Sequence, residues 1–108
     1  MKLSLDEARN RLAGNEQLLR EMITMFIEDA PPRLAKLAAA DDASEARREA
    51  HSIKGHAATV GADDVILMAG QVEAAVQHEG CSALPSLLPA LERTLDETLA
   101  ALRRYLDS

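Results

Sequence analysis

The residues of this 108-residue chain that could do chemistry gather in one short stretch, Ala50 to Ala62, with the sequence AHSIKGHAATVGA. His51 is followed three residues later by Lys54 and then directly by Gly55. A neutral imidazole is a good nucleophile near pH 7, because its unperturbed pKa is about 6.5. A lysine one helical turn away can neutralise the oxygens of an incoming phosphoryl group. The spacing therefore suits phosphoryl transfer through a histidine.

Helical geometry predicts that His51 faces solvent. Successive residues turn about 100° around a helix axis, and five apolar residues of this segment then share one face that must pack inward: Ala46, Ala50, Ile53, Ala57 and Val60. His51 lies about 135° from the centre of that face. Its neighbours at the spacing of helical contacts are small or basic: Arg47, Arg48, Lys54, Gly55 and Ala58.

Gly55 is the unusual residue of this surface. Glycine destabilises a helix by about 1 kcal/mol relative to alanine, and on a solvent-facing surface it contributes no internal packing. We interpret the missing side chain as space through which a bulky partner reaches the imidazole of His51. The alternative is a surface histidine without a task, which is the usual state of a single exposed histidine. The lysine and glycine at contact spacing favour the functional interpretation.

Composition restricts the class of protein. The length predicts a single domain, 1–108. Hydrophobic residues make up 47% of the chain and aromatic ones only 2%, so the core must be built from aliphatic side chains, which suits helix-on-helix packing. The net charge of −6 argues against a nucleic-acid partner. No apolar run approaches the roughly 18 residues that span a bilayer, and no basic amphipathic segment with aromatics indicates membrane contact.

The remaining motifs point away from a cofactor or metal of the protein's own. The chain has no phosphate-binding glycine loop and no candidate Mg²⁺ cage. Three scattered histidines and the single Cys81 do not make a metal site. One cysteine also excludes an internal disulfide, so we expect a cytoplasmic location. Any metal and any phosphoryl donor must then come from a partner.

Helical signals run almost throughout the chain and predict an all-α fold. Ser4 with Glu7 and Asp42 with Glu45 read as capping boxes, and we expect the double proline Pro31–Pro32 to break or kink a helix. The signals delimit five segments: one after Ser4 that Gly14 ends, one from Asn15 to about Ala40, one from Asp42 to Gly61, one from Asp63 or Asp64 to near Gly80, and one after Ser82. Long helices with short loops indicate an antiparallel bundle.

The stretch HSIKGHAATVGA resembles the signature of histidine-containing phosphotransfer (HPt) domains. That signature is a histidine followed by x-x-Lys-Gly and a glycine six residues further on, here His51, Lys54, Gly55 and Gly61. The segment GNEQLLREMITMFIEDAPPRLAKL, Gly14 to Leu37, resembles the helix that precedes it in HPt modules at the end of hybrid sensor kinases. The resemblance therefore covers nearly the whole chain.

The resemblance implies an antiparallel four-helix bundle, here with a short additional N-terminal helix. It implies that His51 takes a phosphoryl group from the aspartate of one receiver domain and passes it to another. Lys54 would stabilise the phosphoryl group, Gly55 would give the receiver access, and Gly61 would close the helix. Such a domain is a phosphotransfer intermediate without turnover of its own, and not an enzyme.

Glu73 is the candidate for orienting the imidazole. Family members often place a carboxylate or amide on the neighbouring helix, where it accepts a hydrogen bond from Nδ1–H and leaves Nε2 free to attack. By its spacing from the motif, Glu73 falls there. A solvated glutamate without this role is the alternative, and Gln71 is a weaker substitute.

Other residues near the motif are candidates for partner binding. The predicted docking surface comprises Arg47, Arg48, Ala58 and Leu67, with Gly70 and Ala74 beside Leu67. Leu67 could instead pack against the first helix. His56 departs from the family pattern, which usually has Ser, Ala or Gly there, and lies about 140° around the helix from His51. We interpret His56 as a flank residue at a packing boundary.

The expected function is that of a phosphorelay intermediate in two-component signalling. Its partners would be response-regulator receiver domains, which supply the Mg²⁺, and a sensor histidine kinase, and the domain itself would be a monomer. Direct phosphorylation by a kinase ATP domain shares the same motif, although Gly14 to Leu37 favours the hybrid-kinase type. The alternative from a different class is a non-phosphorylated helical adaptor that docks receiver or kinase domains. A general-base enzyme lacks both a pocket and a second catalytic group.

Overall fold

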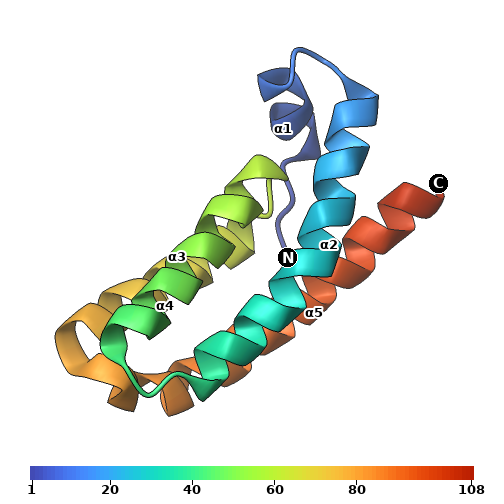
Figure 1. Cartoon of the computed structure of the whole chain (residues 1–108). Helices are drawn as coiled ribbons and strands as arrows, with labels where there is room; N and C mark the ends of the chain where they lie inside the picture. Colours follow the sequence, from blue (N-terminus) through green and yellow to red (C-terminus); the bar gives the residue numbers. More distant parts are fainter.

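The computed structural model describes all residues from 1 to 108 and contains only helices and short connections (Figure 1). Four long helices form an antiparallel bundle, preceded by one short helix, which confirms the predicted fold class. The elements are α1 (Leu5–Arg11), α2 (Glu16–Ala39), α3 (Ala43–Thr59), α4 (Asp63–Glu79), the 3₁₀ turn η1 (Gly80–Ala83) and α5 (Leu84–Asp107).

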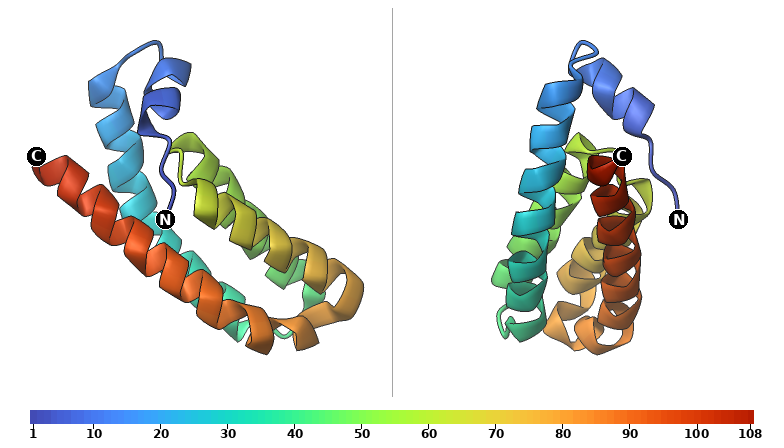
Figure 2. Two further views of the ribbon diagram at one scale, coloured as in Figure 1. Left: turned by 180° about the vertical axis from the view of Figure 1, so that it is seen from behind. Right: turned by 90° about the vertical axis from the view of Figure 1, so that its right-hand side faces the viewer.

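The bundle pairs each long helix with the next in the chain, and α2 also packs against α5. Helices α2 and α5 have 24 residues each and α3 and α4 have 17, which correspond to about 36 Å and 26 Å. The longer pair therefore extends past the α3–α4 turn, at the end where α1 lies (Figures 1 and 2). The molecule measures 41 × 22 × 20 Å.

The buried side chains are those that helical periodicity assigns to the inward faces. All five apolar residues of the α3 face are fully buried. The apolar face of α4 is buried at Val65, Ala69, Val72 and Val76 and half-buried at Met68. On α5 the leucines that point to the bundle axis are Leu84, Leu91, Leu95, Leu99 and Leu102. Their burial, at about 25 cal/mol per Å² of apolar surface removed from water, is what holds the four helices together.

Helix α2 runs without interruption through Pro31 and Pro32, so the predicted break does not occur. Proline has no N–H to donate, and each ring costs the helix about 3 kcal/mol in its interior. Both prolines are exposed, whereas Ala30 before them and Leu37 after them are buried in the core. Packing on both sides of the pair therefore overrides the local preference.

The helix caps agree with the sequence in part. Asn15 accepts a hydrogen bond from the Leu18 N–H at 3.0 Å, and Asp42 accepts one from Ser44 at 2.8 Å. Ser4 occupies the N-cap position of α1, but its hydroxyl donates to the carboxylate of Asp63 and makes no capping bond. The predicted capping box at the start of α1 is therefore wrong, and the serine joins two parts of the chain instead.

The N-terminal segment is fastened across the α3–α4 turn. The Ser4 N–H donates to the Gly61 carbonyl at 2.8 Å, and the Lys2 N–H donates to Asp64 at 2.7 Å. From α1, the Arg11 guanidinium donates to the Ala58 carbonyl at 2.7 Å, near the C-terminal end of α3, where the same carbonyl accepts a longer bond from the Gly61 N–H at 3.4 Å. These bonds hold the end of α3 that follows the His51 motif.

We predict opposite effects for two glycine substitutions in α3 and its turn. Gly61 has a φ of +69°, and a Cβ there would overlap the backbone of Ser4, so Gly61→Ala should lower the free energy of unfolding by about 3 kcal/mol. Gly55 has nothing near its missing side chain, and Gly55→Ala should raise it by about 1 kcal/mol. Urea denaturation of the two variants measures both free energies. Equal effects would contradict the close contact between the N-terminal segment and the α3–α4 turn.

Candidate functional site

His51 lies on the solvent side of α3, at the position that helical periodicity predicts. Its side chain is 67% exposed, while Ala50 and Ile53 beside it are fully buried. The buried face fixes the rotation of α3 about its own axis and therefore fixes the direction in which the imidazole points. His51 is thus open to a macromolecular partner and to no internal substrate.

Glu73 of α4 connects the histidine to the lysine. Its Oε2 lies 2.9 Å from His51 Nδ1, and its Oε1 accepts a hydrogen bond from Lys54 Nζ at 2.5 Å. The α4 residues Val72 and Val76, which flank Glu73 along the helix, are buried and hold it against α3. The contact expected for Glu73 is therefore present, and a single carboxylate binds both groups of the motif.

The charge of Glu73 determines the tautomer of His51. The hydrogen bond from Lys54 lowers the pKa of Glu73 below its ordinary value of 4.5, burial opposes this, and the His51 contact lowers the pKa further. Glu73 is therefore ionised at neutral pH and can only accept hydrogen bonds. Nδ1 of His51 must then carry the proton that it donates, and in the neutral imidazole this tautomer leaves the lone pair on Nε2.

Glycines keep the surroundings of this pair open. A Cβ at Gly55 would meet no atom within 4 Å, so the surface of α3 beside His51 is bare. A Cβ at Gly70 of α4 would lie 3.6 Å from Cδ of Lys54, which shows that the lysine stem crosses α4 at that glycine on its way to Glu73. Of the three bonded side chains, the imidazole is therefore the most exposed, at 67% against 34% for Lys54 and 23% for Glu73.

Positive charge surrounds the imidazole on its other side. A shallow, open recess of about 390 Å³ is lined by His51, Glu73 and three residues from the first half of α3: Ser44, Arg47 and Arg48. Both arginines are exposed and neither takes part in an ion pair, so their guanidinium groups are free for a partner. Ser44 did not emerge from the sequence, because a serine in the first turn of a helix is unremarkable.

The other predicted contact residues are placed as follows. Leu67 is 61% exposed, which excludes its packing against α1, and Ala74 is also exposed, whereas Gly70 is half-buried. Ala58 is exposed, and its backbone carbonyl accepts a hydrogen bond from Arg11. Gln71 is exposed and makes no hydrogen bond to His51, so it does not substitute for Glu73.

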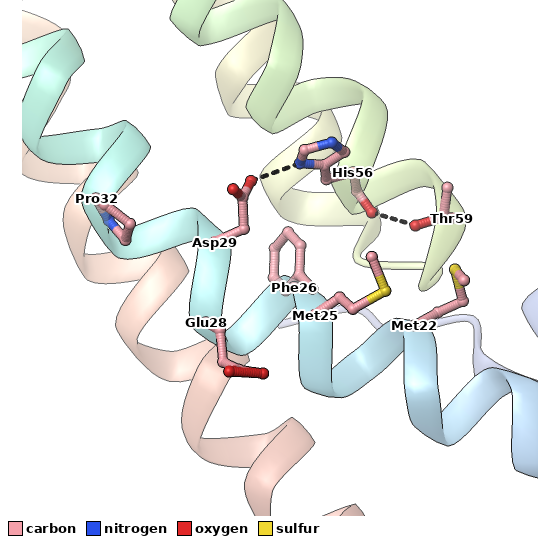
Figure 3. A pocket seen from close by; sticks show the side chains of 8 residues that line it. All are labelled: Met22, Met25, Phe26, Glu28, Asp29, Pro32, His56 and Thr59. Atoms are coloured by element: carbon pink, nitrogen blue, oxygen red, sulfur yellow. Dashed lines mark hydrogen bonds and ion pairs between the residues drawn. The ribbon is translucent and has the colours of Figure 1, made fainter.

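His56 belongs to a different side-chain cluster, on the α2 side of α3 (Figure 3). Its Nδ1 lies 2.8 Å from Asp29 Oδ2, Asp29 also pairs with Arg33 at 2.6 Å, and Arg33 reaches Glu49 at 3.1 Å. Glu49 is buried, with 7% of its surface exposed. The sequence pattern did not predict this chain of charges. Its only signal was a glutamate beside the buried Ala50, a position that demands a cation from another helix.

No cluster of three or more His, Cys, Asp or Glu side chains that could hold a metal ion is present. Cys81 is a free, half-buried thiol in η1. Nor is any helix both long enough and apolar enough to cross a membrane.

Comparison with known protein families matches residues 21–105 to the Hpt domain. The matched region contains His51, Lys54, Gly55 and Glu73, the four residues that the structure brings together. The comparisons with curated proteins and with solved structures found no match.

Glu73→Gln should destabilise the protein in a pH-dependent way. The pKa of Glu73 is lower in the folded protein than its ordinary 4.5, so its stabilisation is complete above that pH and disappears as the pH falls through the folded value. The free energy of unfolding should drop by about 1 kcal/mol at pH 7, and the difference from the unchanged protein should shrink below pH 4.5. Urea denaturation of the variant and the unchanged protein, at pH 7 and at a pH below 4.5, measures this difference in the free energy of unfolding.

Glu97→Gln on α5 is the matched control, because Glu97 is exposed and outside any ion pair. Its effect should be close to zero at both pH values. A loss for Glu73→Gln that is the same at pH 7 and at acidic pH would contradict the ionised contact.

Proposed function

Because this chain belongs to the Hpt domain family, we propose that it is a phosphorelay intermediate in which His51 carries the phosphoryl group. Members of the family are phosphotransfer carriers of two-component signalling that work with response-regulator receiver domains and kinases. The finer proposal is the route: a receiver-domain aspartate donates to His51, and His51 passes the group to the aspartate of another receiver.

One observation carries this proposal: an exposed imidazole whose Nδ1 is bonded to a carboxylate that also binds a lysine. The carboxylate holds the tautomer in which Nε2 is the nucleophile. The bare surface at Gly55 lets the mouth of a receiver active site reach that atom. A surface histidine without a task needs neither the shared carboxylate nor the glycine.

In the proposed transfer, the Nε2 lone pair attacks the phosphorus of the receiver's aspartyl phosphate, and the P–O bond to the aspartate breaks. The aspartate leaves as a carboxylate with the bonding electrons. The imidazole becomes an N-phosphorylated cation that keeps its proton on Nδ1, where Glu73 stabilises the positive charge at 2.9 Å. The reverse sequence returns the phosphoryl group to a second receiver.

Lys54 is proposed to stabilise the transferred phosphoryl group. Its Nζ is bound to Glu73 on the same face as His51, and a flexible stem with a charged ammonium can turn from a carboxylate to a phosphoryl oxygen. Arg47 and Arg48 add positive charge on the other side of the imidazole. They are proposed to steer the acidic active site of a receiver toward His51.

The domain is proposed to bring no metal or cofactor of its own. The carboxylate nearest the imidazole is already bound by Lys54 and His51, and the free groups around it are cations, which do not fit a Mg²⁺ ligand set. The receiver would therefore supply Mg²⁺. We further propose that the domain acts as a monomer in the cytoplasm, together with a sensor histidine kinase that starts the relay.

His51→Gln should abolish phosphoryl transfer from a purified, phosphorylated receiver domain. The unchanged protein should acquire a label that is labile in acid and stable in base, as expected for a phosphohistidine, and the variant should acquire none. Transfer is measured with radiolabelled receiver, and the same variant is titrated for receiver binding.

His78→Gln is the matched control and should accept the label like the unchanged protein, because His78 is exposed in the last turn of α4 and does not line the recess at His51. Receiver binding without any labelling of the unchanged protein, by several receivers of the same genome, would instead support the adaptor function.

Lys54→Met should slow the same transfer about tenfold while leaving His51 the labelled residue. The substitution removes the ammonium charge and keeps the apolar stem beside Gly70, and one charge-assisted hydrogen bond in a transition state is worth about 1.4 kcal/mol or more. Single-turnover kinetics at saturating receiver measure the rate. An unchanged rate would restrict Lys54 to its contact with Glu73.

A further inference from the structure

A second surface feature lies on the other side of α3 from the His51 recess. It is a groove of about 420 Å³ between α2 and α3 (Figure 3). Its principal lining residues are Met22, Met25, Phe26, Glu28, Asp29 and His56. Met25 is 59% exposed, so an apolar side chain stands at the mouth of a groove that an aromatic ring closes from below. The mechanism proposed for His51 makes no use of it.

The edge of this groove is acidic, in contrast to the basic recess at His51. Glu21 and Glu28 flank Met25 on the exposed face of α2, at the spacing of helical neighbours. Neither carboxylate takes part in an ion pair, and Glu21 has only a weak bond from Gln17 at 3.4 Å. An apolar site between two free carboxylates suits an apolar side chain that lies beside a lysine or arginine.

The inner wall of the groove is held in place before any partner arrives. His56 binds Asp29, Asp29 binds Arg33, and Arg33 binds the buried Glu49. This chain of charges links the facing sides of α2 and α3. The methionine side chains come from α2, the helix that also carries Asp29. They are unbranched and adapt to the shape of what they contact. The groove therefore combines side chains fixed by ion pairs with adaptable ones.

Gly55 connects the groove to His51. Successive residues of α3 are about 100° apart, so Gly55 lies between them, about 40° from His51 and about 100° from His56, and the two histidines are separated by about 7.5 Å along the axis. Because Gly55 has no side chain, no side chain rises from α3 at this position between His51 and the groove. A protein that covers the roughly 800 Å² of a standard interface around His51 therefore also reaches the groove.

We infer that the groove between α2 and α3 seats an apolar side chain flanked by a basic residue on the receiver that docks over His51, and that it selects among receivers by this pattern. The inference rests on the proposed function. The basic recess attracts any acidic active site, so it discriminates poorly. The groove adds a buried contact for an apolar side chain of the receiver. Its acidic edge favours a receiver with a basic residue beside that side chain, and the two requirements together distinguish one receiver from another.

Two variants test this inference: Met25→Ala, which removes the apolar wall, and Glu28→Lys, which reverses the charge of the edge. Both residues are exposed, so the fold should be kept. The control is Glu97→Lys, the same charge change on the exposed side of α5. Binding of purified receiver domains is measured by calorimetry. Phosphorylation of His51 by phosphoramidate, a small donor that needs no docking surface, is measured separately.

We expect the dissociation constant of the cognate receiver to rise about tenfold for Met25→Ala and Glu28→Lys and less than twofold for Glu97→Lys, with phosphoramidate labelling unchanged. A receiver whose docking lysine or arginine is replaced by glutamate should regain binding to Glu28→Lys. Unchanged binding in both groove variants would overturn the inference, and so would an equal loss in the control. Receiver binding that depends on the groove, with no labelling of His51 by any donor, would overturn the proposed function and leave the docking site standing.

Discussion

The site depends on one carboxylate that two groups share. Glu73 binds Nδ1 of His51 through one oxygen and Nζ of Lys54 through the other, and this arrangement requires α3 and α4 to keep their register and their rotation. Burial of the inward faces fixes the rotation of each helix. The N-terminal segment, bonded to Gly61, Asp64 and Ala58, fixes the turn that sets the register. The rest of the bundle therefore keeps α3 and α4 in the positions at which Glu73 can bond to His51 and Lys54.

The two exposed sides of α3 differ in chemistry because their neighbouring helices differ. Toward α4, Lys54 is bound by Glu73, whereas Arg47 and Arg48 make no ion pair and lie beside an open imidazole. Toward α2, two carboxylates neutralise Arg33, and the carboxylates of Glu21 and Glu28 beside the groove make no ion pair. The helix of 17 residues thus lies between a basic recess that contains the nucleophile and an acidic, apolar groove whose apolar and acidic residues come from α2. This asymmetry gives a partner a defined orientation.

Helical periodicity was sufficient for the parts of the fold that depend on one helix at a time. The buried faces of α3, α4 and α5 and the exposure of His51 follow from spacing alone, and the place of Glu73 followed from the motif. Contacts between different helices could not be predicted from this spacing. The bonds Ser4–Asp63, His56–Asp29 and Arg33–Glu49 depend on the relative register of two helices, which no pattern within one helix contains. The break expected at Pro31–Pro32 failed because burial on both sides outweighs local propensity.

The bare surface at Gly55 also has an entropic consequence. A side chain that enters an interface loses rotamer freedom, at about 0.5 to 1.5 kcal/mol for each one immobilised, and glycine has none to lose. In the proposed docking over His51, Gly55 therefore opposes association very little. It also offers no side-chain atoms that would prolong the contact. The proposed relay, in which the domain binds one receiver, leaves it and binds another, is served by a contact surface that is quick to form and quick to release.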